Sequence, residues 1–253
     1  MEIYQHKIED IYNAFNKDIE HFIADGLPIP LYSTWKNISI DLSGGTDSAI
    51  LAYLLCKELK RRKQDTVLHI INGHRCWSRK PWQKEVALRV INWLKNYHPN
   101  IKTHFVFVAE GLESKPINGV NAESIQLDDF KQYIDSLYHI DMKFNTTSAL
   151  YPYAPDEFIQ GIKSRNRKDI LMHKLIQLEE KDARPFLYIN KEWIIKQYVN
   201  NDILDLLDIT RSCEGKKGKD RSYPQVCNNC YWCLERNWAL EQNGLQPELP
   251  TKI

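Results

Sequence analysis

The chain has 253 residues, a hydrophobic fraction of 43%, a charged fraction of 26% and a formal net charge of +1. This length and composition are those of a globular protein with a core of normal size, and the balanced charge gives no support for a protein that coats nucleic acid by bulk electrostatics. No apolar run is long enough to span a bilayer and the first residues lack the basic stretch and apolar core of a secretory signal, so we expect a cytoplasmic protein with no membrane partner.

Residues 1–35 precede the main fold, and apolar side chains recur in them at helical spacing from about Tyr4 to Ala24. The stretch Gly26-Leu27-Pro28-Ile29-Pro30 ends this predicted helix. We expect an N-terminal helical extension that packs against the main domain or against a partner subunit. The sequence leaves the oligomeric state open, with a homodimer as one option.

Short apolar segments then alternate with longer amphipathic ones, which predicts strands followed by helices. The predicted strands span residues 37–42, 66–71 and 103–108 with a further one near Phe144, and the predicted helices span 47–62, 81–97, 124–139, 157–180 and 191–199. Residues 110–121 are predicted to form a loop. This alternation predicts an α/β domain over residues 36–205, with a parallel sheet, right-handed crossovers and helices on both faces.

The junction between the first predicted strand and the first helix of this domain is rich in glycine and hydroxyl groups. Gly44 and Gly45 allow a tight turn that brings bare N–H groups close to phosphate oxygens, and the helix N-terminus adds unpaired donors and the positive end of its dipole. Asp47 can cap the helix or hold Mg²⁺ beside the phosphates. The predicted nucleotide-binding residues at this junction are Leu42, Ser43, Gly44, Gly45, Thr46, Asp47 and Ser48.

This junction is not a Walker A loop, because the Gly-Lys-Ser/Thr ending is missing, and that absence argues against γ-phosphoryl transfer. The alternative interpretation is a Gly-Gly turn with a Thr/Asp helix cap that arises by chance. A strand before it, a helix after it and three hydroxyl groups within six residues favour a loop that holds the pyrophosphate end of ATP.

Four of the six cysteines lie close to the end of the sequence with the spacing C-x13-C-x2-C-x2-C: Cys213, Cys227, Cys230 and Cys233. Two overlapping C-x2-C steps can direct thiolates at one centre, and a fourth thiolate completes a tetrahedron, which predicts a structural zinc site. The alternatives are buried or free thiols, or a redox C-x-x-C pair. We predict a zinc-binding module over residues 206–253, in which Arg236 and the basic loop at 215–221 offset the charge of the thiolates.

The loop Ser43-Gly44-Gly45-Thr46-Asp47-Ser48 resembles the signature of the pyrophosphate-loop (N-type) ATP pyrophosphatases, which include GMP synthetase, NAD synthetase and several tRNA-modifying enzymes. The cysteine region is similar to the zinc-binding C-terminus of 7-cyano-7-deazaguanine synthase, which has a Ser-Cys step, three cysteines as C-x2-C-x2-C and an Arg three residues on. Gly161 to Asn166 resembles the Gly-Arg-Asn segment of that family, and Pro185 with Lys191 resembles its Pro…Lys step. The resemblance covers islands between about Ile38 and Leu240.

The resemblance implies an ATP-dependent carbon–nitrogen ligase of queuosine biosynthesis. Such an enzyme adenylates 7-carboxy-7-deazaguanine, lets ammonia attack to give the amide, and uses a second ATP to convert the amide into the nitrile. The implied cofactors are ATP, Mg²⁺ and Zn²⁺, the implied partners are the deazapurine carboxylate and ammonia, and direct nucleic-acid binding is not expected. Asp47, Arg165 and Lys191 become the candidate catalytic residues, and Arg165 and Asn166 join the nucleotide-binding set; the alternative for each cation is a surface or helix-cap charge.

The sequence departs from the family pattern in three places. The first 35 residues are extra, the interval from Cys213 to Cys227 is longer, and Gly73-His74-Arg75-Cys76-Trp77 stands where the family has a Gly-Gln-Arg-His-like segment. The sequence therefore leaves open the exact carboxylate, whether the reaction stops at the amide, the ammonia source and the fate of the product. Two other functions also stay open: a sulfur-inserting adenylase of tRNA with Cys76 as its thiol, and an ATP-regulated nucleic-acid-binding protein that uses the basic loop.

Overall fold

The computed structural model describes residues 3–74, 82–107, 116–117, 120–154, 165–213 and 226–247. Of residues 116–117 and 120–124 it describes only the backbone path. No helix among these residues has the length and apolar character that crossing a membrane requires.

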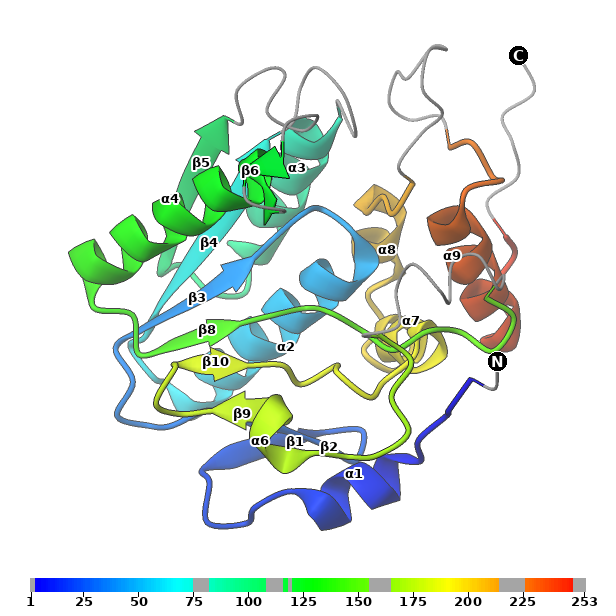
Figure 1. Ribbon diagram of the computed structural model, residues 1–253, viewed down its shortest axis with the longest axis horizontal. Helices are drawn as coiled ribbons and strands as arrows, with labels where there is room; N and C mark the ends of the chain where they lie inside the picture. The colour runs from blue at the N-terminus through cyan, green and yellow to red at the C-terminus, as the bar shows by residue number, and fades with distance from the viewer. Residues whose placement is uncertain are drawn as a thin grey trace.

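A six-stranded sheet forms the centre of the molecule (Figure 1). Its strands, in spatial order, are β5 (Ile101–Phe107), β4 (Val67–His74), β3 (Asn37–Asp41), β8 (Met142–Phe144), β10 (Asp182–Ala183) and β9 (Ile176–Gln177). Neighbouring strands are parallel except for the β10–β9 pair, which is antiparallel. The predicted parallel sheet is therefore confirmed, with one antiparallel strand at its edge.

Helices cover both faces of the sheet, as predicted. In Figure 1, α4 (Ala122–Tyr138) lies in front of the strands, whereas α2 (Thr46–Arg62) and α3 (Gln83–Leu94) lie behind them. The helices α7 (Lys191–Asn200), α8 (Leu204–Ile209) and α9 (Tyr231–Gln242) follow towards the C-terminus. Buried Ile38 and Ile40 of β3 and the apolar side of α2 belong to one continuous hydrophobic core, which explains why this strand and this helix form next to each other.

The order of the strands fixes where a ligand can bind. From β3 the chain moves outward to β4 and β5, then returns to the opposite side of β3 to form β8 and β10. A crevice opens at such a reversal outside the carboxyl ends of the strands, which is the usual ligand position in open parallel sheets. The Gly-rich loop follows the carboxyl end of β3 at this reversal.

The N-terminal segment differs from the prediction of one long helix. Helix α1 spans only Ile8–Ala14, and a hairpin of β1 (His21–Ala24) and β2 (Leu27–Pro30) follows it. The two residues between these strands, Asp25 and Gly26, both have positive φ angles, 45° and 83°, as a type I′ hairpin turn requires. Most of the apolar residues that were read as one helix face pack into or against the main core, whereas Tyr12 and Ile23 are exposed.

The predicted helix at 157–180 is also wrong over its described part. Residues 155–164 lie outside the described residues, and the only helix between 165 and 180 is α6 (Met172–Leu175). Strands β9 and β10 follow it, with Lys181 between them at φ 52°. Ile176 and Gln177 of β9 pair with β10, which in turn pairs with β8, so this segment extends the central sheet, and these tertiary contacts outweigh the helical pattern of the sequence.

Four further elements were not predicted. Helices α8 and α9 flank the cysteine region. Within the predicted loop at 110–121, the strands β6 (Pro116–Ile117) and β7 (Val120–Asn121) form a short antiparallel pair. The other predicted strands and helices agree with the structure to within a few residues at each end.

Candidate active site

The phosphate loop joins β3 to α2 through a turn that needs glycine. Gly44 has a φ angle of +82°, and a Cβ atom placed on it would lie 2.8 Å from Val86 Cγ1 and 3.1 Å from the backbone nitrogen of Ala87. Gly45 is the residue that caps α2, and it supplies no side-chain hydrogen bond to the helix. The N–H groups of the first turn of this 17-residue helix are therefore directed at the space above the loop without a side-chain cap.

Four hydroxyl groups surround that space. Ser43 Oγ lies 3.4 Å from Ser48 Oγ, and Thr46 Oγ1 lies 3.3 Å from Ser212 Oγ. A Cβ atom on Gly45 would lie 3.4 Å from Ser43 Oγ and 3.7 Å from both Ser212 Oγ and the Arg211 carbonyl oxygen, so it would be in contact with two members of this hydroxyl ring. We call the cavity over the ring, of about 110 Å³, the phosphate pocket; its lining residues are Ser43, Gly45, Thr46, Asp47, Ser48, Trp82, Thr146, Lys191, Arg211, Ser212 and Trp232.

Asp47 and Lys191 meet at the edge of the phosphate pocket. Lys191 Nζ forms an ion pair with Asp47 Oδ1 and lies 3.4 Å from Thr46 Oγ1. The Ser148 hydroxyl donates to Asp47 Oδ2 at 3.0 Å. Only 3% of Lys191 is exposed, and it is the first residue of α7, where the helix dipole disfavours a cation. A lysine held in this unfavourable position needs nearby carboxylates, and it is available to bind an anion in the pocket.

Arg165 lies behind these residues and is 5% exposed. Its guanidinium donates to the carbonyl oxygens of Ser148 and Ala149, to the Ser148 hydroxyl, and to Glu235 Oε1 at 3.0 Å. Burial lowers the pKa of Arg165, but the negative charges of Glu235 and Asp47 outweigh this effect and the pKa is raised, so Arg165 stays a cation. Arg165 therefore supports the loop that carries Ser148, and through it Asp47.

Two contacts from later parts of the chain, made by Tyr198 and Arg211, also hold the backbone of the phosphate loop. The Tyr198 hydroxyl of α7 donates to the carbonyl oxygen of Thr46 at 2.7 Å, and burial raises the pKa of Tyr198 well above its ordinary value, which keeps this donor protonated. The backbone nitrogen of Arg211 donates to the Gly44 carbonyl at 2.9 Å. The Arg211 guanidinium lies 4.1 Å from the centre of the Trp82 ring, where a cation is stabilised by the ring face.

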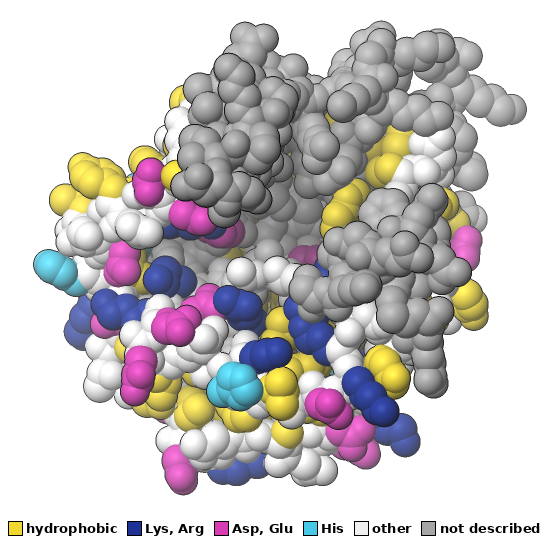
Figure 2. Space-filling model, viewed as in Figure 1, with side chains coloured by type: hydrophobic (Ala, Val, Ile, Leu, Met, Phe, Trp, Pro, Cys, Tyr) yellow, Lys and Arg dark blue, Asp and Glu magenta, His cyan; other side chains and the backbone are white. Residues whose placement is uncertain are grey.

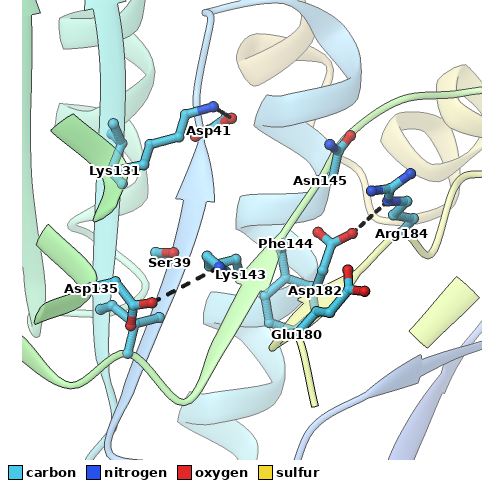
Figure 3. Close-up of a pocket in the computed structure, with 12 residues that line it drawn as sticks. Ser39, Asp41, Lys131, Asp135, Lys143, Phe144, Asn145, Glu180, Asp182 and Arg184 are labelled. Atoms are coloured by element: carbon cyan, nitrogen blue, oxygen red, sulfur yellow. Dashed lines mark hydrogen bonds and ion pairs between the residues drawn. The ribbon is translucent and has the colours of Figure 1, made fainter. Parts of the chain in front are cut away.

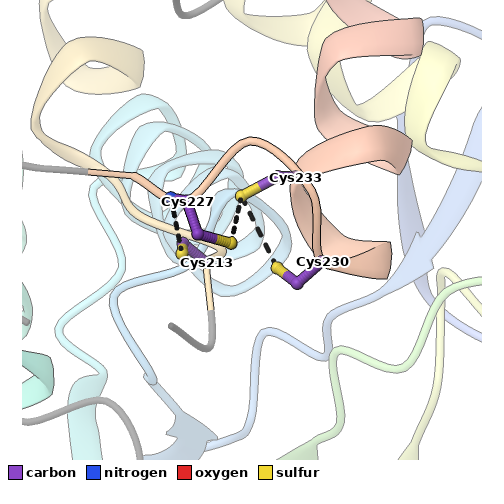
Figure 4. Close-up of side chains that lie close together, drawn as sticks. All are labelled: Cys213, Cys227, Cys230 and Cys233. Carbon is purple, nitrogen blue, oxygen red and sulfur yellow. Dashed lines mark hydrogen bonds between the residues drawn. The ribbon is translucent and has the colours of Figure 1, made fainter. Parts of the chain in front are cut away.

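The four cysteines lie together at the start of α9 (Figure 4). Their sulfur atoms are all within 4.8 Å of one another; Cys230 Sγ is 3.5 Å and Cys227 Sγ is 3.9 Å from Cys233 Sγ. Four thiolates around one tetrahedral metal with metal–sulfur bonds of about 2.3 Å would be about 3.8 Å apart. The sulfur positions therefore fit a single metal ion, whereas the thiolates of a cluster of several irons bind different iron atoms and must lie farther apart.

Contact with the thiols of Cys213 and Cys230, together with burial, raises the pKa of the Cys233 thiol. A bound cation would favour the thiolate form of Cys233. Arg236, which we expected to offset the thiolate charge, donates to Thr210 Oγ1 at 2.8 Å and to the Leu207 carbonyl at 3.1 Å. It thereby anchors the segment that carries Ser212 and Cys213.

The structure brings most of the predicted site residues together, with two exceptions. The backbone of Leu42 is bonded to Ile71 and Asn72 of β4, so Leu42 supports the loop from the sheet. Asn166 Oδ1 accepts from the backbone nitrogen of Tyr4, and Asn166 lines a different cavity. Gly161 to Ser164, Cys76 and the basic loop at 215–221 lie outside the described residues.

Several residues of the site were not predicted: Ser148, Tyr198, Ser212, Trp232 and Glu235. Ser212 carried a usable signal, because it directly precedes the first cysteine of the metal motif. Trp232 and Glu235 carried a similar signal, because Trp232 lies within the last C-x2-C step and Glu235 lies two residues after it, whereas nothing in the local sequence of Ser148 and Tyr198 separates them from scaffold residues.

A second cavity, of about 310 Å³, lies against the uncovered part of the sheet beside α4 (Figure 3). Six of its seven charged side chains form ion pairs with one another: Lys131 with Asp41 at 2.6 Å, Arg184 with Asp182 at 2.5 Å, and Lys143 with Asp135 at 3.9 Å; the seventh is Glu180. Figure 2 shows basic and acidic side chains interspersed over the described part of this face. This balance of charge offers no concentrated field for an anion, so we place the chemistry at the phosphate pocket.

No protein-family model matches the chain, and no curated protein sequence matches it. Among solved structures, the chain is similar to the U34-tRNA thiolase NcsA from Methanococcus maripaludis, a structure with a [4Fe-4S] cluster, with 15% identity, a TM-score of 0.47, and coverage of 93% of this chain and 72% of that one. It is also similar to an NAD+ synthetase from Burkholderia pseudomallei, with 11% identity, a TM-score of 0.38, and coverage of 74% of this chain and 61% of that one. Likeness at this level identifies neither an activity nor a substrate.

Proposed function

We propose that this protein is an ATP-dependent enzyme that adenylates a carboxylate substrate, with the pyrophosphate end of ATP in the phosphate pocket. The observation that carries the proposal is the ring of hydroxyls and helix-terminal N–H groups around Gly45, with Lys191 at its edge. Neutral donors, a helix N-terminus and one buried cation together provide the groups that a leaving pyrophosphate needs.

The reaction requires two covalent changes. A carboxylate oxygen attacks the α-phosphorus, the bond from that phosphorus to the bridging oxygen of the β-phosphate breaks, and pyrophosphate leaves with the bonding electrons. Lys191 and the N-terminus of α2 would stabilise the charge that develops on pyrophosphate, and Asp47 is the carboxylate in reach of a nucleotide-bound Mg²⁺. Ammonia then attacks the acyl carbon, a proton is lost, and AMP leaves to give the amide.

We further propose 7-carboxy-7-deazaguanine, or a related carboxylate, as the substrate and zinc as the ion held by the four cysteines. The sequence resemblance to 7-cyano-7-deazaguanine synthase supports the substrate, and the compact set of four sulfur atoms supports zinc. In the further step to the nitrile, the amide oxygen attacks the α-phosphorus of a second ATP and displaces pyrophosphate, and the amide nitrogen then loses its two protons as the C–O bond breaks and AMP departs.

The experiment is to incubate the protein with 7-carboxy-7-deazaguanine labelled with ¹⁸O in the carboxylate, MgATP and ammonium, and to analyse products by mass. Adenylation transfers one ¹⁸O atom to AMP and yields the amide or nitrile. The variant Asp47→Ala should lose AMP formation, and Asp18→Ala, which removes an exposed carboxylate, should keep it. Unlabelled AMP, or ADP in place of AMP, would contradict the proposed chemistry.

A further inference from the structure

Glu235 is a carboxylate that no part of the proposed chemistry uses, although it has no solvent exposure (0%). Its Oε1 atom accepts hydrogen bonds from Arg165 Nη2 and from the Tyr231 hydroxyl, both at 3.0 Å. Its Oε2 atom has no hydrogen bond and lies 3.7 Å from Lys191 Nζ. Burying a carboxylate is costly unless nearby cations compensate it, so the position of Glu235 depends on Arg165 and Lys191 together.

Both of these cations are also linked to Asp47, one directly and one through a hydroxyl group. Lys191 contacts Asp47 directly, and Arg165 is linked to it through the Ser148 hydroxyl, which donates to Asp47 Oδ2. The four charged groups therefore form one cluster with two cations and two carboxylates, in which Arg165, Lys191 and Glu235 are buried and Asp47 is partly exposed. When Asp47 is engaged by a nucleotide-bound Mg²⁺, Glu235 is the carboxylate of this cluster that remains within reach of Lys191.

Helix α9 connects this cluster to the cysteine site. The helix begins directly after Cys230, carries Cys233 in its first turn, and presents Glu235 two residues later. The next residue, Arg236, holds Thr210 at the start of the segment that leads through Ser212 to Cys213. A metal ion that fixes Cys230 and Cys233 therefore also fixes the helical turn from which Glu235 extends.

We propose that Glu235 is a positioning residue: it holds Lys191 in the orientation that binds the phosphates of ATP, holds Arg165 in the orientation that supports Ser148 and Asp47, and links this arrangement to metal binding by the four cysteines. The inference rests on the proposed ATP site. Glu235 does not line the phosphate pocket, so it would act on the pocket through its contacts with Arg165 and Lys191.

The first test measures the affinity for the α,β-methylene analogue of ATP with Mg²⁺ by calorimetry, on the zinc-loaded full chain. Glu235→Gln keeps the shape of the side chain and removes its charge, and we expect it to weaken binding about 30-fold. Glu235→Asp restores the charge and should bind more tightly than Glu235→Gln. Glu241→Gln makes the same change at an exposed position of the same helix and should bind like the wild type.

The outcomes separate this inference from the proposed function. Failure of the wild-type chain to bind the analogue would refute the ATP site and with it the role of Glu235. Wild-type binding with Glu235→Gln unaffected, or with Glu235→Asp as weak as Glu235→Gln, would refute the positioning role alone. If Glu235→Gln does not fold, Tyr231→Phe removes one hydrogen bond from the same carboxylate; it should weaken binding about threefold or more, and unchanged affinity would overturn the inference.

A second readout would not change if Glu235 were merely structural. Because coupling between the affinities of two sites is reciprocal, the bound analogue should protect Zn²⁺ from a colorimetric chelator in an equilibrium competition, in the wild type and in Glu241→Gln. The analogue should give no such protection in folded Glu235→Gln at saturating concentration. Equal protection in Glu235→Gln and wild type would show that the two sites communicate without this carboxylate, against the proposal.

Discussion

Replacing Gly44 with alanine tests the geometry of the phosphate loop in a way that can be worked out from the structure. Holding alanine at a φ angle near +82° costs about 1–2 kcal/mol, because the Cβ atom then crowds the following carbonyl oxygen. The new Cβ would also lie 2.8 Å from Val86 Cγ1 and 3.1 Å from the Ala87 nitrogen. Overpacking of this kind costs about 1–3 kcal/mol more, so we expect Gly44→Ala to lose about 2–5 kcal/mol of unfolding free energy.

Gly244 provides the matched control. Its φ angle is +70°, and a Cβ atom on it would meet nothing within 4 Å, so Gly244→Ala carries the backbone cost without the steric one. Urea unfolding of both variants and the wild type, with equal m-values, measures the difference. If Gly44→Ala is no less stable than Gly244→Ala to within about 0.5 kcal/mol, the close packing of the loop against α3 is wrong.

Three further predictions follow from the site and its surroundings. Gly45→Ala should change the unfolding free energy by no more than about 1 kcal/mol. It should abolish calorimetrically detectable binding of MgATP, because the new Cβ atom would lie against the hydroxyls of Ser43 and Ser212. Tight binding of MgATP by this variant would show that the hydroxyl ring does not hold the phosphates. Cys230→Ser should release the metal and lower the melting temperature by roughly 5 °C or more. The control Asn229→Ser, in the same loop, should leave the metal content and the melting temperature unchanged. A Cys230→Ser protein that melts like the wild type would contradict a structural metal site. Burial, with smaller contributions from His104 and Lys102, lowers the pKa of His69 from 6.5 to about 4. Between these pH values the unfolded chain therefore binds more protons at this residue than the folded chain does. The contribution of neutral His69 to the unfolding free energy is thus fully present above pH 6.5 and is lost as the pH falls towards 4. His69→Asn should flatten that part of the urea-midpoint profile relative to the exposed control His139→Asn, and an unchanged slope would refute the assignment.

The sequence was sufficient to predict the central α/β elements because their signals are local. The apolar segment that forms β3, the Gly-Gly turn and the amphipathic pattern of α2 follow one another directly, and the structure places them as expected. The cysteine spacing likewise predicted that Cys213 would join three cysteines located at least 14 residues away, and their sulfur atoms do lie together.

Predictions failed where contacts distant in the sequence decide the structure. Ile19, Phe22 and Ile23 fit a helical pattern, but the Asp25-Gly26 turn and the main core favour a hairpin. The Asp-Gly dipeptide is the sequence signal that predicts such a hairpin turn. Strand β10 exists only because β8 offers it a partner about 40 residues earlier in the chain.

The candidate site shows the same limit. Glu235 meets Arg165 across 70 residues of sequence, and Tyr198 meets Thr46 across 152, so no local pattern could reveal either pairing. What the sequence could supply was the set of residues next to a recognisable motif. The residues that orient them come from the packing of α7 and α9 around the phosphate loop.

The stretch from Thr210 to Cys213 has a consequence for how this protein can be rebuilt or shortened. Within four consecutive residues it contributes a hydroxyl to the phosphate pocket, a backbone bond to Gly44 and a sulfur to the cysteine site. The cysteine-containing end therefore cannot be exchanged as an independent module, because any graft that replaces this stretch also replaces part of the lining of the phosphate pocket. Chimeras between such proteins should be joined within α7 or earlier.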